Sequence, residues 1–123
     1  FELDLNKCTD HELEIAKKKV REYRELQEVF HKGDCYRLKS PFETDLSAVE
    51  FVSEDKKTAV VCISSYKGTA YSPDEFIKPQ GLCENATYRI GENSYDGKYL
   101  MNYGILFRND RENKSEIIVM RAE

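Results

Sequence analysis

Apolar residues in the first third of the chain recur at helical spacing. Thr9 and Glu12 have the form of a capping box, in which the threonine caps the helix and the glutamate reaches back to it. Gly33 can take the left-handed conformation that often ends a helix. The pattern predicts one amphipathic helix from about residue 10 to about residue 31. Its apolar stripe comprises Leu13, Ala16, Val20, Tyr23 and Phe30, with Leu26 and Val29 alongside.

After Gly33 the pattern changes to the alternation and the β-branched runs of strands. Val49 and Phe51 alternate with Glu50, and an apolar run follows a polar turn, so these segments predict a hairpin. We therefore expect a mainly β fold: an antiparallel β-sandwich of Greek-key type with about seven or eight strands, preceded by one long N-terminal α-helix. The expected turn of the hairpin is 54–57 and its second strand 58–65; later strands are expected at 76–78, 87–90, 103–107 and 116–120, with loops at 67–74, 91–97 and 109–114.

Length and charge fit one globular domain and argue against two classes of partner. The chain has 123 residues, of which 40% are hydrophobic and 34% charged, an ordinary composition for such a domain. The formal net charge of −4 argues against nucleic-acid binding, which needs a basic surface. A membrane span needs roughly 18 or more consecutive apolar residues, and the sequence has no such run. We expect a helical segment over residues 1–33 and a sandwich domain over residues 34–123.

The cysteines indicate reduced thiols. No two of them form the C-x-x-C pair that is typical of zinc or redox sites. Cys62 lies within an apolar run, where a reduced thiol packs as a small hydrophobic group. No signal peptide is visible, so we expect free thiols and a cytoplasmic location. The cysteines are Cys8, Cys35, Cys62 and Cys83.

Candidate catalytic side chains do not gather in any recognisable pattern. His11 and His31 lie at opposite ends of the predicted helix, so they do not form a metal-binding pair four residues apart. A glycosidase needs two carboxyl groups across one sugar, whereas the acids here lie in turns or on the polar face of the helix. We predict no catalytic, cofactor-binding or metal-ligating residue in this chain. The turn acids are Glu54, Asp55, Asp74, Asp96 and Asp110.

Aromatic residues leave two interpretations open. The chain has eight tyrosines and no tryptophan. Tyrosine rings can stack on the apolar faces of sugars, as in a carbohydrate-binding module, or they can pack at the core and rim of a sandwich. The tyrosines that could form such a platform are Tyr66, Tyr71, Tyr95, Tyr99 and Tyr103.

Five short motifs are spread along most of the chain. They are Glu-x-Asp-Leu at 2–5, Gly-Asp-x-Tyr-Arg-Leu-x-Ser-Pro-Phe-Glu at 33–43, Val-Ser-Glu-Asp-Lys at 52–56, Tyr-Arg-Ile at 88–90 and Gly-x-x-Leu-Met-Asn-x-Gly at 97–104. In order and spacing they resemble the C-terminal part of α-galactosidases of glycoside hydrolase family thirty-six. Each motif alone is weak, but the series is specific.

The resemblance implies a longer parent enzyme with an N-terminal β-supersandwich, a central (β/α)₈ barrel and this C-terminal sandwich. The parent would hydrolyse terminal α-D-galactosides such as melibiose and raffinose with retention of configuration, without metal or cofactor. Its two catalytic aspartates would lie in the barrel, upstream of Phe1. Residues 1–33 would then be the last barrel segment and helix, and the sandwich would cover that helix and support assembly. The implied partners are the barrel, the parent's α-galactoside substrates and a second copy of the chain.

Two other functions remain open at this point. An independent carbohydrate-binding module would use the tyrosines, and a protein-interaction domain would use the apolar stripe of the helix. The residues Phe1 to Leu5 alternate like the end of a strand, so we expect the chain to begin inside a larger structure.

Overall fold

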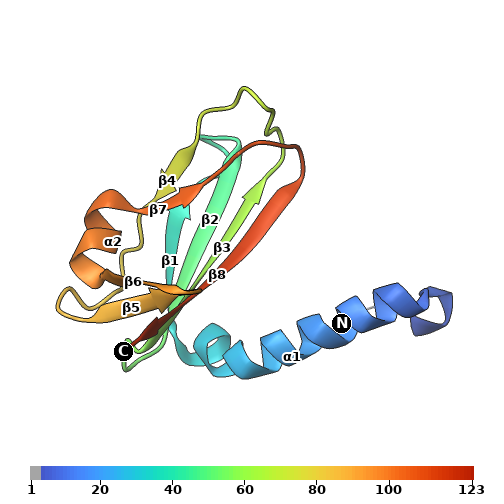
Figure 1. The fold of residues 1–123 in the computed structure, drawn as a ribbon, viewed down its shortest axis with the longest axis horizontal. Coiled ribbons are helices and arrows are strands. Elements are labelled where there is room, and N and C mark those ends of the chain that lie inside the picture. Colours follow the sequence, from blue (N-terminus) through green and yellow to red (C-terminus); the bar gives the residue numbers. More distant parts are fainter. Residues whose placement is uncertain (1–3) are drawn as a thin grey trace.

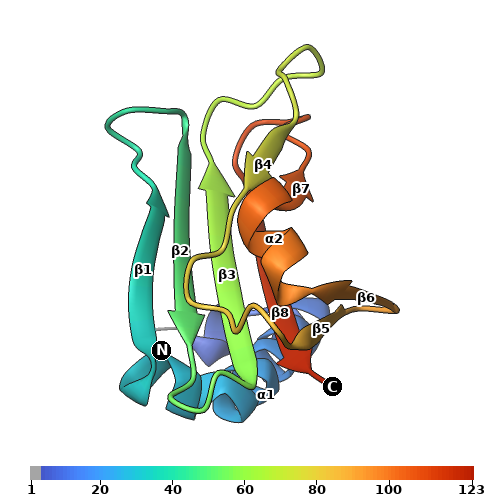
Figure 2. The same ribbon diagram turned by 90° about the vertical axis from the view of Figure 1, so that its left-hand side faces the viewer.

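The computed structural model describes residues 4–123 as three layers. A long helix, α1, lies on one face of a six-stranded sheet, and shorter elements cover the opposite face (Figure 1, Figure 2). This arrangement confirms the expected mainly β sandwich with one long N-terminal helix. The elements are η1 (Leu5–Lys7), α1 (Asp10–Lys32), β1 (Asp34–Lys39), β2 (Leu46–Val52), β3 (Thr58–Ser65), β4 (Glu75–Ile77), β5 (Thr87–Ile90), β6 (Asn93–Asp96), α2 (Gly97–Tyr103), β7 (Ile105–Phe107) and β8 (Lys114–Ala122).

The large sheet is antiparallel throughout, with the strand order β1-β2-β3-β8-β5-β6. The predicted hairpin is confirmed, because β2 and β3 pair over their whole lengths. The last strand, β8, inserts between β3 and β5, so the centre of the sheet joins distant parts of the sequence. Such pairings are fixed by the packing of both faces rather than by local turns. The core on the face away from α1 includes Leu46, Ala48, Val52, Val61, Ile63 and Met120.

The second layer is small. It consists of the two-stranded sheet β4-β7 and the helix α2, which lie on the side of the sheet opposite α1 (Figure 2). Ile77, Leu100 and Phe107 are its buried side chains, and they join the main core. Gly104 has φ +88°, a conformation that favours glycine, and it turns the chain from α2 directly into β7.

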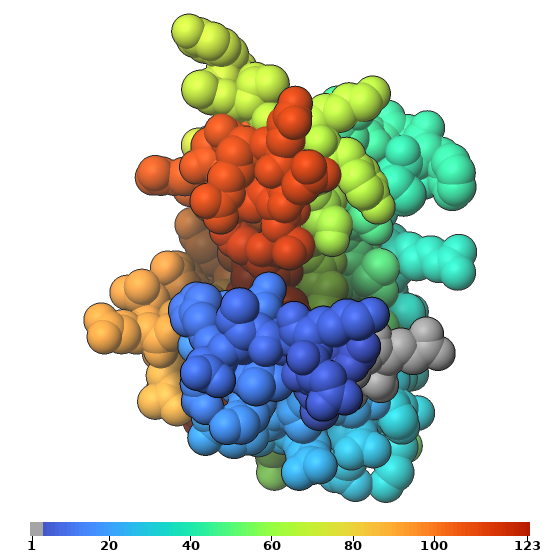
Figure 3. Space-filling model, turned by 90° about the vertical axis from the view of Figure 1, so that its right-hand side faces the viewer, coloured from blue at the N-terminus to red at the C-terminus, as the bar shows by residue number. Residues whose placement is uncertain are grey.

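The C-terminal half of α1 packs against the sheet. Leu26 and Val29 are buried against Val60 of β3, and the ring of Phe30 meets that of Phe51 edge to face, with centroids 5.2 Å apart. The N-terminal half of the helix projects away from the sandwich (Figure 1). In the space-filling view it projects in front of the sandwich (Figure 3).

Both ends of α1 agree with the prediction, but the conformation of its C-terminal cap does not. The capping box is confirmed: the Thr9 hydroxyl accepts a hydrogen bond from the Glu12 N–H, and the Glu12 carboxylate accepts one from the Thr9 N–H. Gly33, however, is extended (φ −76°, ψ 163°) rather than left-handed, because the chain continues straight into β1. A Cβ at Gly33 would lie 2.4 Å from the Val52 carbonyl oxygen and 2.5 Å from that of Val29. Glycine is therefore needed there for close approach.

The region before β7 also differs from the prediction. The turn expected at 91–97 contains the strand β6, which pairs with β5, and Tyr103, expected in a strand, ends the helix α2. Neither element has a full period of apolar residues, so hydrophobic spacing alone does not reveal it. The predicted alternation at the N-terminus falls mostly on Phe1 to Leu3, outside the described residues. Leu5 begins a short 3-10 turn.

Candidate docking surface

The N-terminal half of α1 carries apolar side chains that the sandwich does not cover. Leu13, Ala16 and Val20 are partly exposed, and the helix here projects away from the sandwich (Figure 1). With 3.6 residues per turn, these side chains are rotated by about 100° around the helix from Leu26, which is buried against the sheet. The single stripe predicted from the sequence is thus two stripes. One packs on the sandwich, and the other is partly exposed and belongs to neither core cluster of residues 4–123.

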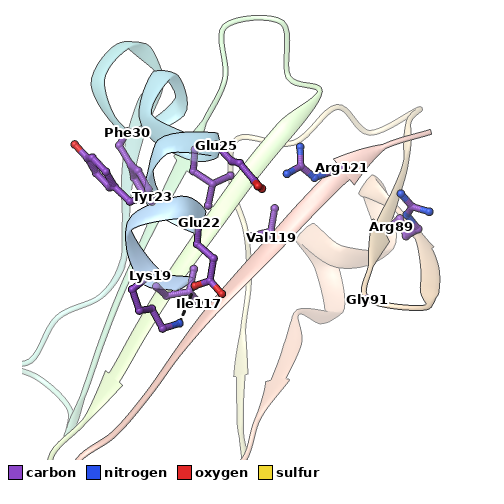
Figure 4. A pocket seen from close by; sticks show the side chains of 11 residues that line it. Lys19, Glu22, Tyr23, Glu25, Phe30, Arg89, Gly91, Ile117, Val119 and Arg121 are labelled. Atoms are coloured by element: carbon purple, nitrogen blue, oxygen red, sulfur yellow. Dashed lines mark hydrogen bonds and ion pairs between the residues drawn. The ribbon is translucent and has the colours of Figure 1, made fainter. Parts of the chain in front are cut away.

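A groove of about 650 Å³ lies beside the contact between α1 and the sheet. Figure 4 shows α1 on one side of it and the strand β8 on the other. Leu26, Ile117 and Val119 give the groove an apolar floor, and Ile117 is 55% exposed. On the α1 side, Lys19 and Glu22 form an ion pair at 2.8 Å.

Two arginines lie directly opposite each other at the end of the groove. Arg89 of β5 and Arg121 of β8 are register partners, so both side chains project from the same face of the sheet (Figure 4). Like charges placed opposite each other on neighbouring strands are destabilising. The Arg89 Nε lies 3.8 Å from a Glu123 carboxylate oxygen in an exposed pair.

Three of the five candidate tyrosines form one stacked row. The ring centroids of Tyr95 and Tyr99 are 6.1 Å apart, those of Tyr99 and Tyr103 are 4.9 Å apart, and both pairs are nearly parallel. Tyr66 and Tyr71 lie outside the row, on the loop that follows β3. A sugar stacks on a free aromatic face, whereas the inner faces of this row are filled by neighbouring rings. The facing sides of these rings are therefore not available to a sugar.

Glu50 is a buried carboxyl group that the sequence pattern did not single out. It is 0% exposed and points into the core, while Val49 and Phe51 lie on the α1 side of β2. One carboxylate oxygen accepts hydrogen bonds from the backbone N–H groups of Gln80 at 2.7 Å and Gly81 at 3.1 Å. The other oxygen has no hydrogen-bond partner in the described part of the chain. Burial raises the pKa of Glu50, and the two N–H groups oppose that rise.

Several other titratable groups stabilise turns or face solvent. His31 is exposed and its Nε2 lies 2.8 Å from the Tyr23 hydroxyl. The hydrogen bonds from the Lys57 N–H and the Ser53 hydroxyl lower the pKa of Asp55, as suits a turn acid. Lys114 likewise lowers the pKa of Asp110. Across residues 4–123 no group of three or more histidine, cysteine, aspartate or glutamate side chains is placed to hold a metal ion.

The cysteines are free thiols in the structure. Cys62 lies on the α1 side of β3, next to the contact between the helix and the sheet, and burial raises the pKa of its thiol. It therefore packs as an apolar group, as expected. From residue 4 onward, no helix is long and apolar enough to cross a membrane.

The Glycosyl hydrolase family 36 C-terminal domain matches this chain over residues 46–120. The chain belongs to this family. The match begins at β2 and ends within β8, so it includes both layers of the sandwich. The resemblance expected from the motifs is thus confirmed.

Curated relatives that match this chain at about one-third identity are named as α-galactosidases. Alpha-galactosidase AgaA of Geobacillus stearothermophilus is 35% identical over 106 residues, which are 85% of this chain and 14% of that protein. Probable alpha-galactosidase C of Aspergillus flavus is 32% identical over 92 residues, which are 74% of this chain and 12% of that protein. The chain therefore spans about a seventh of the length of the family 36 relatives that it matches.

Solved structures extend the likeness to the helix. The crystal structure of the family 36 α-galactosidase AgaA matches 99% of this chain with a TM-score of 0.94 at 31% identity, and the match covers 17% of that chain. The α-galactosidase of Lactobacillus brevis matches 99% of this chain with a TM-score of 0.91 at 27% identity, and 18% of that chain. Because the match covers nearly every residue, α1 lies on the sandwich in these family members as it does here.

Proposed function

We propose that this family 36 domain is the non-catalytic C-terminal part of an α-galactosidase. In this proposal the full-length polypeptide hydrolyses terminal α-D-galactosides, such as melibiose and raffinose, with retention of configuration. The chemistry belongs to a (β/α)₈ barrel outside this chain. The names of the relatives support the activity.

The uncovered apolar stripe of α1 carries this proposal. Leu13, Ala16 and Val20 are partly exposed and rotated by about 100° around the helix from Leu26, which the same helix buries against the sheet together with Val29. A helix with apolar residues on two sides needs two packing partners. The proposed second partner is the barrel, so that α1 is shared between the barrel and the sandwich and joins them rigidly.

Substitutions on two sides of α1 in the full-length polypeptide test the role of the stripe. Val20→Glu places a carboxylate in the proposed contact, and we expect loss of soluble, active α-galactosidase. Lys18→Glu is the matched control, since it introduces the same residue two positions away on the exposed side of the helix. We expect its activity on a chromogenic α-galactoside to be near that of the unchanged enzyme. Equal activity of both variants would contradict the proposal.

Two further properties of the full-length polypeptide are proposed on indirect support. Four free thiols suit a reducing compartment, so we propose a cytoplasmic location.

Light scattering on the purified full-length polypeptide tests whether it forms a homo-oligomer, the remaining partner that the family resemblance implies. A strict monomer across a hundredfold range of concentration would remove that partner.

A further inference from the structure

The charges around the groove between α1 and β8 point to a specific kind of occupant. Arg89 and Arg121 are cross-strand partners on its rim, where like charges are destabilising, and the described residues supply one paired carboxylate, that of Glu123, 3.8 Å from Arg89. We infer that the groove receives an amphipathic segment of the catalytic part of the same polypeptide, with carboxylates that pair with both arginines. This inference rests on the proposed function, because it names how the barrel contacts this domain.

The floor of the groove requires an apolar partner. Ile117 is 55% exposed although it lies in a central strand of the sheet, and Val119 next to it is partly exposed. Both side chains face the groove with Leu26 of α1 (Figure 4). Exposed apolar residues that are contiguous and rimmed by charges are typical of a contact surface. The occupant therefore presents apolar side chains towards β8.

The rim of the groove requires an acidic partner. On the α1 wall, Lys19 is already paired with Glu22. On the sheet wall, no carboxylate within residues 4–123, Glu25 included, forms an ion pair with Arg121. A guanidinium group binds a carboxylate through two parallel hydrogen bonds, which is the geometry that a fixed docking contact uses. Glu123 offsets the charge of Arg89 in an exposed pair, so the charge left at this end is mainly that of Arg121, and the side of the occupant that reaches it is acidic.

The position of the groove favours the same polypeptide over a separate partner. The groove is bounded by Lys19, Glu22 and Tyr23, and the uncovered stripe at Leu13 and Val20 lies on the same stretch of α1. One body that packs on the stripe also reaches the groove. The matched structures show that such a body is available, because this chain covers only 17% of the AgaA chain.

Substitution of Arg121 tests the inference, because we expect it to change the melting temperature differently in the 123-residue chain and in the full-length polypeptide. Arg121→Gln removes the like-charge pair, so in the 123-residue chain we expect an unchanged or higher melting temperature. In the full-length polypeptide the same substitution removes the proposed contact, and we expect a lower melting temperature. Arg121→Lys keeps the charge and should restore most of the full-length value. A fall in both proteins, or no fall in the full-length polypeptide, would overturn the inference.

Arginine footprinting identifies the occupant independently. We expect phenylglyoxal to modify Arg89 and Arg121 several-fold more slowly in the full-length polypeptide than in the 123-residue chain, relative to Arg111 on the loop before β8. Protection that appears in the 123-residue chain and increases with its concentration would assign the groove to a second copy and overturn the inference. If Val20→Glu abolishes activity while the arginines stay unprotected, the groove inference fails and the proposed function stands. If Val20→Glu has no effect on activity and the arginines are also unprotected, the proposed function fails.

Discussion

Glu50 joins the two layers of the sandwich through its carboxyl group. The side chain extends from β2 into the core, and one oxygen accepts the N–H groups of Gln80 and Gly81 on the loop after β4. The carboxylate therefore ties this loop to β2. Such a buried acceptor is costly to desolvate, and the cost is repaid in the fixed path of the loop. The residue is therefore structural, although a buried acid often indicates a functional site.

Two substitutions of Glu50 separate the contribution of its hydrogen-bond acceptor to stability from that of its negative charge. Glu50→Leu leaves two backbone N–H groups without an acceptor, and each buried unsatisfied donor costs about 1–3 kcal/mol. Glu50→Gln keeps an oxygen for the same N–H groups. We therefore expect Glu50→Leu to be less stable than Glu50→Gln by about 2 kcal/mol in urea unfolding. Equal unfolding free energies for the two variants would show that the hydrogen bonds to the loop contribute little.

The raised pKa of Glu50 gives a definite sign to the pH dependence. Burial raises the pKa above its ordinary value of 4.5, so the native state binds this proton more tightly than the unfolded state. The stabilising contribution is complete below pH 4.5 and is lost as the pH rises through the native pKa. We expect the stability of Glu50→Gln relative to the natural chain to increase over this range. Denaturant titrations at a series of pH values measure it, and a difference that falls with pH would contradict the assignment.

The single sequence did not reveal Glu50 because the strand pattern could be assigned in two ways. Alternation predicts which residues share a face, and it correctly placed Val49 and Phe51 together, opposite Glu50. It does not say that both faces of β2 are covered. Since α1 packs on the side of Phe51, the charged residue is left on the core side. The arginine pair was missed for a related reason: only the register of β5 against β8 brings Arg89 and Arg121 together.

At the scale of elements, some features of α1 are determined by neighbouring residues in the sequence, and others depend on how the helix packs on the sheet. Its existence, its start and its capping box follow from the sequence alone, because the Thr9 and Glu12 interactions are local. The division of its apolar residues into two stripes depends on where the sheet lies, which helical spacing does not encode. The short helix α2 was not predicted for the converse reason. It is held by Leu100 in the core rather than by its own pattern.

The N-terminal cap of α1 should matter locally but not globally. Thr9→Ala removes a cap that is worth about 1 kcal/mol, in a part of the helix that has no contact with the sheet. We expect amide exchange over residues 11–20 to accelerate about fivefold, with an unchanged melting temperature for the sandwich. Glu12→Gln is the matched control, because glutamine can complete the same capping box. A large fall in the global melting temperature would mean that this half of α1 is coupled to the core.

At the scale of the whole molecule, the family was readable from the sequence and the topology was not. The motifs from Gly33 to Gly104 identify the family by their order, and the apolar runs place most strands within a few residues. The insertion of β8 between β3 and β5 is a long-range pairing, which no local rule determines. The unequal layers follow from that insertion, since six strands join one sheet and two are left to cover it with α2.

We predict that the 123-residue chain does not hydrolyse glycosides by itself, and the surroundings of three of its described acids are the reason. A retaining glycosidase holds two carboxyl groups about 5–5.5 Å apart across one sugar, and both must be reachable by substrate. Glu50 is closed to solvent, while Asp55 and Asp110 are held by hydrogen bonds within their own turns. We expect no turnover of a chromogenic α-galactoside by the 123-residue chain above that of a mock purification. Turnover that persists through a second purification and saturates with substrate would place a catalytic site within this domain, and the structural role argued from α1 would have to be abandoned.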